Sequence, residues 1–426
     1  MSARVYGVTR RSALAALAAA TAGAACGVRR ESEPSLDAVA EDYVRAALAL
    51  ALHQPTLVET WRGPDNWRPE RREPVAQIRR RLDEINRAAA LASASGQDDP
   101  RAHYLRQQLD ALILAARRLA GESFAFDEEA SLAFGAPVTA FLSGLSSEAA
   151  QVSLDEAQAT LQRLLPGGGA LQQRYAAFRA RHAIAPARVP AALAAVTSAC
   201  RRRLEPHVAL PSGESTRSGL APGLGVEALA SYEGDLRTSV QIDQASSLDL
   251  ARLVWLVAHE TYPGHHLQYV LADNDLVQRR GWRERALHPS FGGHLLYAEG
   301  AAEAGASLLL AGESFEALCR EVSGEAAVDG DSVAELAAVH RAVIELDVHV
   351  VKVARRYLDG ELASNAAAEQ LASAALILDA PRMLQVIERQ RTRILAYPAG
   401  RRIVAGYLQT GSAWERLTAV ATSLVL

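Results

Sequence analysis

Apolar residues recur every three or four positions through most of this chain, and this spacing predicts a mainly α-helical protein. Between the helical segments we expect a Trp- and Pro-containing connector at residues 55–74 and a loop with three Phe at residues 122–137. Residues 227–235 and 238–243 predict one or two strands around Gly234. The helices are expected at 35–53, 75–120 (two helices broken near 96–100), 154–165, 171–184, 189–204, 248–259, 295–310, 333–358 and 366–397.

The pattern contains no internal repeat and no low-complexity linker, so residues 27–426 are expected to form one domain. Within it, residues 27–150 form a helical N-terminal part, and residues 150–426 carry the candidate chemistry. The composition agrees with a helical fold, because Ala, Leu, Arg and Glu are abundant and only 5% of the residues are aromatic.

The first 26 residues predict a targeting segment rather than part of the fold. Arg10 and Arg11 precede an apolar, Ala-rich run at residues 13–25, which is typical of a twin-arginine export signal. Cys26 follows Gly-Ala-Ala and resembles a lipoprotein cleavage site. We therefore predict export to the cell envelope, with a lipid on Cys26 as the link to a membrane. The alternative is an ordinary cleaved signal in which Cys26 is incidental.

Charge and cysteine content narrow the function classes. The chain has 426 residues and a net charge of −4, so its overall charge gives no case for nucleic-acid binding or for a polybasic membrane contact. The three cysteines, Cys26, Cys200 and Cys319, have no metal-ligand spacing. The candidate chemistry lies with histidine and carboxylate side chains instead.

The segment His-Glu-Thr-Tyr-Pro-Gly-His-His, at residues 259–266, concentrates three of the 11 histidines within eight positions. It follows an apolar helical run, so the first His-Glu pair is expected to be buried and to need a partner. Imidazoles hold the metal in zinc hydrolases, and a glutamate next to the first histidine acts on the metal-bound water. The pattern therefore predicts a zinc hydrolase with His259 as a ligand and Glu260 as the general base.

The spacing departs from the usual His-Glu-x-x-His, because Pro263 stands four positions after His259. In a regular helix His265 would be rotated by about 600°, and His266 would lie about 10.5 Å along the axis. We expect Pro263 and Gly264 to form a bulge that returns one of these two histidines to His259. The alternative is that Pro-Gly ends the helix and leaves both histidines in a surface turn.

A third ligand is expected on the helix at 295–310. Glu299 is the best candidate, and Glu303, one turn later, is expected to support a ligand by hydrogen bonding. Small residues around them would let this helix approach the metal helix closely. His294 is a weaker candidate. The alternative is that both glutamates belong to a solvated face.

Two further residues are candidates for stabilising an oxyanion. Arg341, Glu345 and His349 recur every fourth residue, so His349 either joins the site or belongs to a surface ion-pair ladder. Tyr397 is the second candidate donor. The predicted strands would either bind the substrate backbone, as edge strands do, or form a structural hairpin.

The stretch His-Glu-x-x-Pro-Gly-His-His-Leu-Gln at 259–268 resembles the signature of a bacterial family called "domain of unknown function 885", grouped with gluzincin-type zinc metallopeptidases. Glu299-Gly300 resembles the family's Glu-Gly-Trp block, the segment from Arg341 to His349 its Arg-x-x-Val-Asp-x-Gly-x-His block, and Tyr397-Pro-Ala-Gly its Tyr-Lys-Ile-Gly block. The resemblance covers roughly residues 150–426.

This resemblance implies a multi-helix, zincin-like domain with a small β element beside the metal-binding helix. It implies zinc held by His259, by His265 or His266, and by Glu299. The chain differs from the family in having Ala301 in place of a Trp, Arg393 in place of a Gln, and a shorter N-terminal half. A different substrate preference, or loss of activity, would follow from such changes.

The sequence thus predicts an exported zinc metallopeptidase acting on a peptide. A second hypothesis is a non-catalytic envelope lipoprotein that uses the same scaffold to bind a peptide or a partner. A third is a metal-dependent hydrolase of a small non-peptide amide, because the chemistry at the metal is shared.

Overall fold

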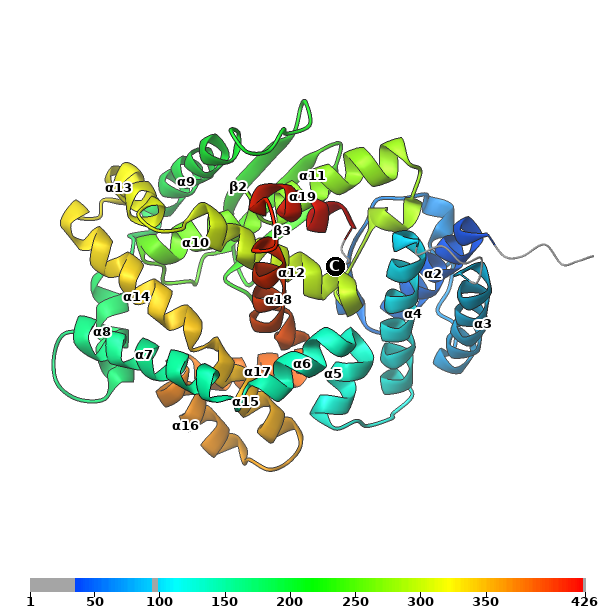
Figure 1. Ribbon diagram of the computed structural model, residues 1–426, viewed down its shortest axis with the longest axis horizontal. Coiled ribbons are helices and arrows are strands. Elements are labelled where there is room, and N and C mark those ends of the chain that lie inside the picture. Colours follow the sequence, from blue (N-terminus) through cyan, green and yellow to red (C-terminus); the bar gives the residue numbers. More distant parts are fainter. Residues whose placement is uncertain (1–34, 94–98, 424–426) are drawn as a thin grey trace, which may run out of the picture.

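Helices make up most of the computed structural model, which describes residues 35–93 and 99–423 (Figure 1). The predicted mainly α fold with a small β element is confirmed. The predicted signal and Cys26 lie outside the described residues. The α-helices are α2 (Leu36–Ala51), α3 (Val75–Ser93), α4 (Pro100–Leu119), α5 (Phe126–Phe134), α6 (Ala136–Gly144), α7 (Glu148–Leu164), α8 (Leu171–Arg181), α9 (Val189–Leu204), α10 (Leu250–Glu260), α11 (His265–Ala272), α12 (Gly292–Leu309), α13 (Ser314–Ala326), α14 (Val333–Glu345), α15 (Asp347–Leu358), α16 (Ser364–Ala374), α17 (Ala380–Gln390), α18 (Pro398–Leu408) and α19 (Ala413–Ser423).

Short helical segments connect them. These are the 3₁₀ segments η1 (Pro55–Leu57), η2 (Asp65–Trp67), η3 (Pro186–Arg188), η5 (Arg283–Ala286), η6 (Gly330–Ser332) and η7 (Arg391–Ala396), and the π-helical segment η4 (Asp273–Arg279). In the described part of the chain, no individual helix has the length and hydrophobicity to cross a bilayer. Residues 171–181 and 186–204, bent by 57° at their break, reach that length and composition only when taken together.

Two small sheets complete the fold. One has the strand order β2 (Ser215–Ala221), β4 (Arg237–Asp243), β3 (Ala228–Gly234), with β4 parallel to β2 and antiparallel to β3. The other pairs β1 (Val58–Trp61) with β5 (Leu287–Pro289), antiparallel. β3 and β4 are the predicted strands, whereas β1, β2 and β5 were not predicted. β1 lies in the segment where only a connector was expected.

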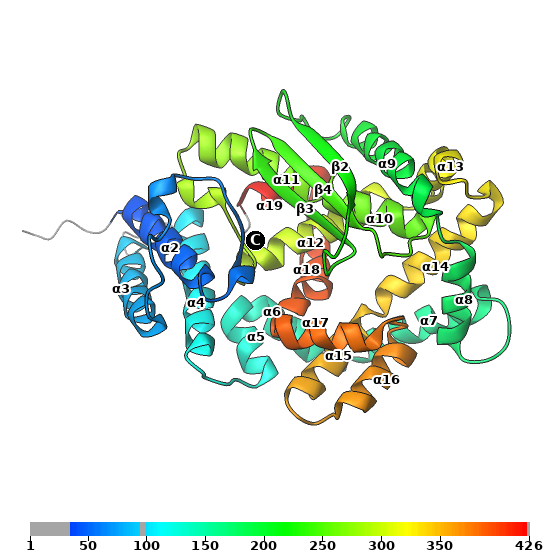
Figure 2. The ribbon, with the colours of Figure 1, turned by 180° about the vertical axis from the view of Figure 1, so that it is seen from behind.

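Helix α12 runs through the middle of the molecule, and almost all of its residues are buried. It packs against α4, α10, α18 and α19, which come from widely separated parts of the sequence (Figure 1). The three-stranded sheet lies on the side turned to the viewer in Figure 2, with β3 against α10 and α11. The central position of α12 brings residues from both ends of the chain to one place.

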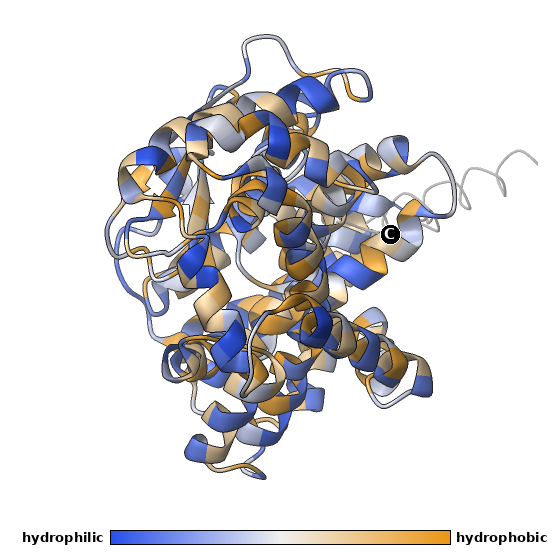
Figure 3. Cartoon of the chain, turned by 90° about the vertical axis from the view of Figure 1, so that its left-hand side faces the viewer, coloured by the Kyte–Doolittle hydropathy of each residue, from blue (hydrophilic) through white to orange (hydrophobic). Residues whose placement is uncertain are grey.

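Most helices bury an apolar side, and hydrophobic and hydrophilic stretches alternate along the helical ribbons in Figure 3. One large cluster of buried side chains extends over α5 to α19. A second cluster joins α2, α3 and α4 to Leu287 and Phe291. The N-terminal helices thus meet the rest of the molecule next to β5.

Three helical expectations were wrong in detail. The predicted loop at 122–137 contains α5, whose first backbone N–H is capped by Asp359 at 2.7 Å, a contact invisible in the local pattern. The single helix expected at 366–397 is broken into α16, α17 and η7, with Asp379 capping the start of α17. The helix expected at 333–358 is divided at Leu346.

Candidate metal centre

Helix α10 carries the first predicted ligand into the core. Asp249 caps its start by accepting a hydrogen bond from the backbone N–H of Arg252. Its last two residues, His259 and Glu260, are buried, as the apolar run before them predicted. The helix ends there because the following Pro263 cannot donate a helical hydrogen bond.

The turn that joins α10 to α11 explains the unusual spacing of the histidines. It contains a cis Tyr262–Pro263 peptide bond, and the Gly264 N–H donates to the carbonyl oxygen of Ala258 at 3.0 Å. A Cβ on Gly264 would lie 1.6 Å from the carbonyl oxygen of His259, so only glycine fits. The interruption is therefore a break between two helices rather than a bulge in one, and α11 begins with His265.

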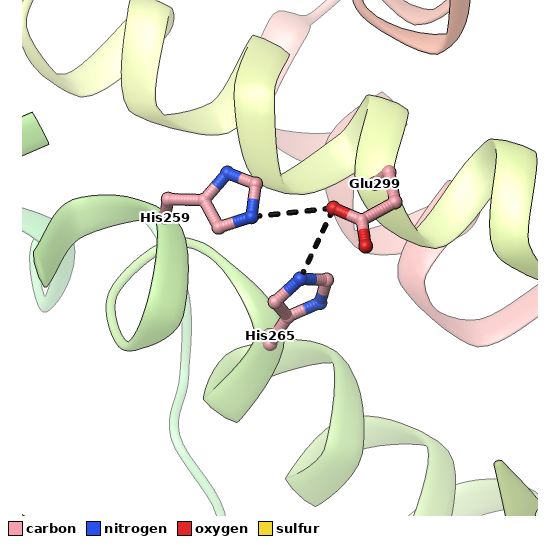
Figure 4. A group of neighbouring side chains, drawn as sticks. All are labelled: His259, His265 and Glu299. Carbon is pink, nitrogen blue, oxygen red and sulfur yellow. Dashed lines mark ion pairs between the residues drawn. The ribbon is translucent and has the colours of Figure 1, made fainter. Parts of the chain in front are cut away.

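His259, His265 and Glu299 converge from α10, α11 and α12 (Figure 4). Oε2 of Glu299 lies 3.3 Å from Nε2 of His259 and 3.4 Å from Nε2 of His265. One ligand atom from each residue lies within 4.8 Å of the other two. Tetrahedral ligands at roughly 2.0–2.1 Å from a zinc ion stand about 3.4 Å apart. The donor set and its spacing therefore fit one such cation.

The cluster leaves polar atoms without partners. Oε2 of Glu299 and Nδ1 of His265 are buried and have no hydrogen-bond partner in the described structure. Burial opposes protonation of both histidines, but nearby carboxylates outweigh it and hold the pKa of His259 and of His265 above the usual value. Burial alone would raise the pKa of Glu299, yet the two histidines hold it far below its usual range. The electrostatics of the cluster thus favour the binding of an additional positive charge.

Glu303 lies beside the first histidine, on the helix where it was expected. Its Oε1 lies 3.1 Å from Nδ1 of His259, the ring nitrogen that does not face Glu299. Burial opposes ionisation of Glu303, but His259 outweighs it and lowers the pKa of this carboxyl. Both glutamates are enclosed by protein, so the alternative of a solvated face does not hold for them.

Glycines on α12 and α18 set the position of Glu299. A Cβ on Gly300 would lie 2.5 Å from the carbonyl oxygen of Gly400, and a Cβ on Gly400 would lie 2.5 Å from the carbonyl oxygen of Leu296. The two backbones therefore touch. A Cβ on Gly305 would lie 3.0 Å from Cγ of Pro263. The small residues thus bring α12 against α18 and against the turn after α10.

Glu260 and Tyr397 border the cluster. The negative charge of Glu260 acts on the pKa of His259, His265 and Tyr397, which places its carboxylate near all three. The ring of Tyr397 lies 6.4 Å from the ring of His259 and is 39% exposed. Glu299, followed by burial, raises the pKa of Tyr397 well above its usual value. Its phenol therefore keeps its proton at neutral pH.

Glu59 also borders the cluster and was not a candidate from the sequence. It stands on β1, where its Oε1 accepts a hydrogen bond from Oγ of Ser290 at 2.7 Å. Its charge acts on Tyr397 and Arg393, and the charges of Glu299 and His265 act on it in turn. Only the pairing of β1 with β5 brings it here, and no local motif around residue 59 reveals that pairing.

The structure separates the two adjacent histidines. His266 is fully buried and faces away from the cluster, with Nε2 2.8 Å from Oε2 of Glu214 and Nδ1 2.8 Å from Oγ1 of Thr238. Tyr262 donates to the same carboxylate oxygen at 2.5 Å. His266 thus ties α11 to the sheet, while His265 lies with His259 and Glu299.

Two other candidates are not part of the converging group. His349 is on α15, where burial and Lys352 lower its pKa and its Nε2 is buried without a hydrogen-bond partner. Arg341, of the same predicted stripe, pairs with Glu316 at 3.0 Å. His294 is buried with Nδ1 3.2 Å from the hydroxyl of Tyr104.

The strand next to α10 is an edge strand, as expected of one that could bind a substrate. β3 is at one edge of its sheet, beside α10 and α11. The carbonyl oxygen of Tyr232 on this strand accepts a hydrogen bond from Nε of Arg62 at 3.1 Å. This backbone carbonyl of β3 is therefore already engaged by a side chain from the N-terminal part of the chain.

Comparison with known proteins shows similarity of fold. No family model and no curated protein matches this chain. A crystal structure described as "the putative lipoprotein from Colwellia psychrerythraea" is similar over 85% of this chain and 68% of that chain, with a TM-score of 0.50 and 12% identity. A "putative lipoprotein of unknown function from Shewanella oneidensis" is similar over 91% of this chain and 73% of that chain, with a TM-score of 0.49 and 11% identity. At this identity, the first similarity concerns the fold alone.

Proposed function

We propose that this protein is a metal-dependent hydrolase that cleaves an amide bond, in the first place a peptide bond. The observation that carries the proposal is the convergence of His259, His265 and Glu299, with Glu260 next to the first of them. The earlier resemblance to the family called "domain of unknown function 885" agrees with it.

The three converging residues would hold the metal, and zinc fits a donor set of two imidazoles and one carboxylate. The chemistry that zinc supplies in such sites is polarisation of a carbonyl group and a lower pKa for water. Imidazole and carboxylate ligands also accept other first-row cations, so the identity of the metal belongs to the test.

Two residues would move or hold protons. Glu260 would take a proton from the attacking water and deliver it to the leaving amine. The Tyr397 phenol, protonated at neutral pH, would donate a hydrogen bond to the oxygen on which negative charge develops. His349 lies apart from this group and has no part in the proposal.

The second candidate function is an envelope lipoprotein that binds a peptide or a partner without cleaving it. The description of the Colwellia psychrerythraea structure as a lipoprotein favours the envelope location. That location agrees with the signal expected before Cys26 and is compatible with either function.

The deciding experiment begins with elemental analysis of the purified mature protein, of His259→Ala and of Glu299→Ala. We expect about one zinc per chain, lost in both variants. Turnover is then measured on a panel of peptides and of acylated small amines, with Glu260→Gln as the variant that should keep its metal and fold but lose activity. A wild type that takes up no metal when zinc is supplied would favour the binding lipoprotein. Activity on the acylated amines alone would indicate a non-peptide amide as the substrate.

A further inference from the structure

Arg393 is an unpaired cation beside the metal centre. Its Nε–H is buried without a hydrogen-bond partner, and the guanidinium makes no hydrogen bond or ion pair within residues 35–93 and 99–423. Its charge interacts with Glu59, Tyr397 and Glu299, which border or form the cluster. Burial lowers the pKa of Arg393, and these three neighbours only partly offset that effect.

The acidic neighbours of Arg393 are engaged elsewhere. Glu59 accepts a hydrogen bond from Ser290, and Glu299 faces the two histidines. The rest of the segment is held firmly, because Arg391 contacts Glu129 at 2.7 Å. The backbone that carries Arg393 is thus fixed, while its guanidinium is left free.

Other guanidinium groups that act on the cluster already have partners. Arg401 lies 3.0 Å from Asp347, and Arg252 lies 2.6 Å from Glu227. Partial burial of a cation costs free energy unless a partner compensates it. An unpaired guanidinium in this position is therefore best explained by a partner that arrives with the substrate.

The partner must also be able to reach it. Glu59 and Tyr397, the neighbours of Arg393 that border the cluster, are both exposed to solvent, and Arg393 itself is partly exposed. The guanidinium of Arg393 is thus within reach of a solute. Glu59 and Glu260, which also border the cluster, carry negative charge, so among these bordering groups Arg393 is the one that offers an anionic part of a solute a positive partner.

We propose that Arg393 binds a carboxylate of the substrate, so that the site takes peptides or N-acyl amino acids whose free terminal carboxylate lies close to the cleaved bond. That a bond close to the carboxylate is cleaved rests on the proposed function. The binding of the carboxylate by Arg393 does not. Guanidinium and carboxylate groups match in a two-point, charge-assisted contact, which makes arginine a strong and selective receptor.

The test measures binding without turnover. The Glu260→Gln protein is titrated calorimetrically with a panel of N-acetyl dipeptides, each as the free acid and as the C-terminal amide. We expect the acid to bind about ten- to a hundredfold more tightly than its amide, as for hydrogen bonds to charged groups. Adding Arg393→Gln should abolish this difference, and Arg393→Lys should keep part of it because the charge remains.

The matched control is Arg389→Gln, which removes an exposed guanidinium four residues earlier and should leave the preference intact. Equal affinity for acid and amide, no binding of either, or an equal loss of both in Arg393→Gln would overturn the inference. Each titration is repeated after zinc has been removed with a chelator. An acid preference that depends on Arg393 in a protein that binds no zinc would refute the proposed function alone. Zinc-dependent cleavage without acid preference would refute this inference alone.

Discussion

Oε1 of Glu303 lies 3.1 Å from Nδ1 of His259, while Nε2 of the same ring faces Glu299. A carboxylate on the outer nitrogen of a ligand histidine fixes the ring and makes the other nitrogen a better donor. Glu303→Gln should therefore weaken zinc affinity about ten- to a hundredfold and leave the fold intact. Competition with a chromogenic chelator measures this. Glu325→Gln, an exposed position on α13, is the control, and equal affinities in the two variants would contradict the role of Glu303.

The adjacent histidines provide a second prediction. His265→Ala should lose its zinc, whereas His266→Ala should keep it and unfold at a lower urea concentration. The second effect follows because the buried carboxylate of Glu214 would lose a hydrogen-bond partner, at a cost of about 1–3 kcal/mol. Metal content and urea denaturation of both variants test the prediction. Loss of zinc in His266→Ala with retention in His265→Ala would reverse the assignment.

Local sequence was sufficient for two of the helices that carry the candidate metal centre. The predicted helix at 248–259 matches α10, and Glu299 and Glu303 stand on α12 as expected, because strong helical periodicity needs no long-range information. The choice between His265 and His266 needed the structure, because it depends on the path of the turn at Gly264.

The rest of the site depends on contacts between distant segments. Glu59 reaches the cluster only because β1 pairs with β5, more than 200 residues later. Arg393 could be singled out only as a departure from the pattern of the family that the sequence resembles, and its lack of a partner is a property of the folded chain. The helix α5 was missed for a similar reason, since its cap comes from Asp359.

Gly264 provides a third prediction. Its Cβ would lie 1.6 Å from the carbonyl oxygen of His259, so Gly264→Ala must displace the turn that places both histidines. We expect a loss of stability on the order of 3 kcal/mol or more, together with loss of zinc. Gly324→Ala, on the exposed side of α13 with open space around it, should instead be neutral or slightly stabilising. Thermal unfolding and metal content test both, and a Gly264→Ala protein that keeps its zinc and stability would refute the close-packing argument.

Glu214 should make the stability of this protein depend on acid pH. Burial would raise its pKa, but hydrogen bonds from His266, Tyr262 and Arg201 outweigh it and lower the pKa from 4.5 to about 2. A carboxylate with a depressed pKa stabilises the fold fully above its unfolded pKa, and this stability is lost as the pH falls from 4.5 toward 2. Urea denaturation at pH 6, 4.5 and 3 should therefore show a smaller acid-dependent loss in Glu214→Gln than in the wild type, and an unchanged loss in Glu325→Gln. If the free energy of unfolding fell equally with pH in all three proteins, the hydrogen bonds of Glu214 would not determine the stability at acid pH.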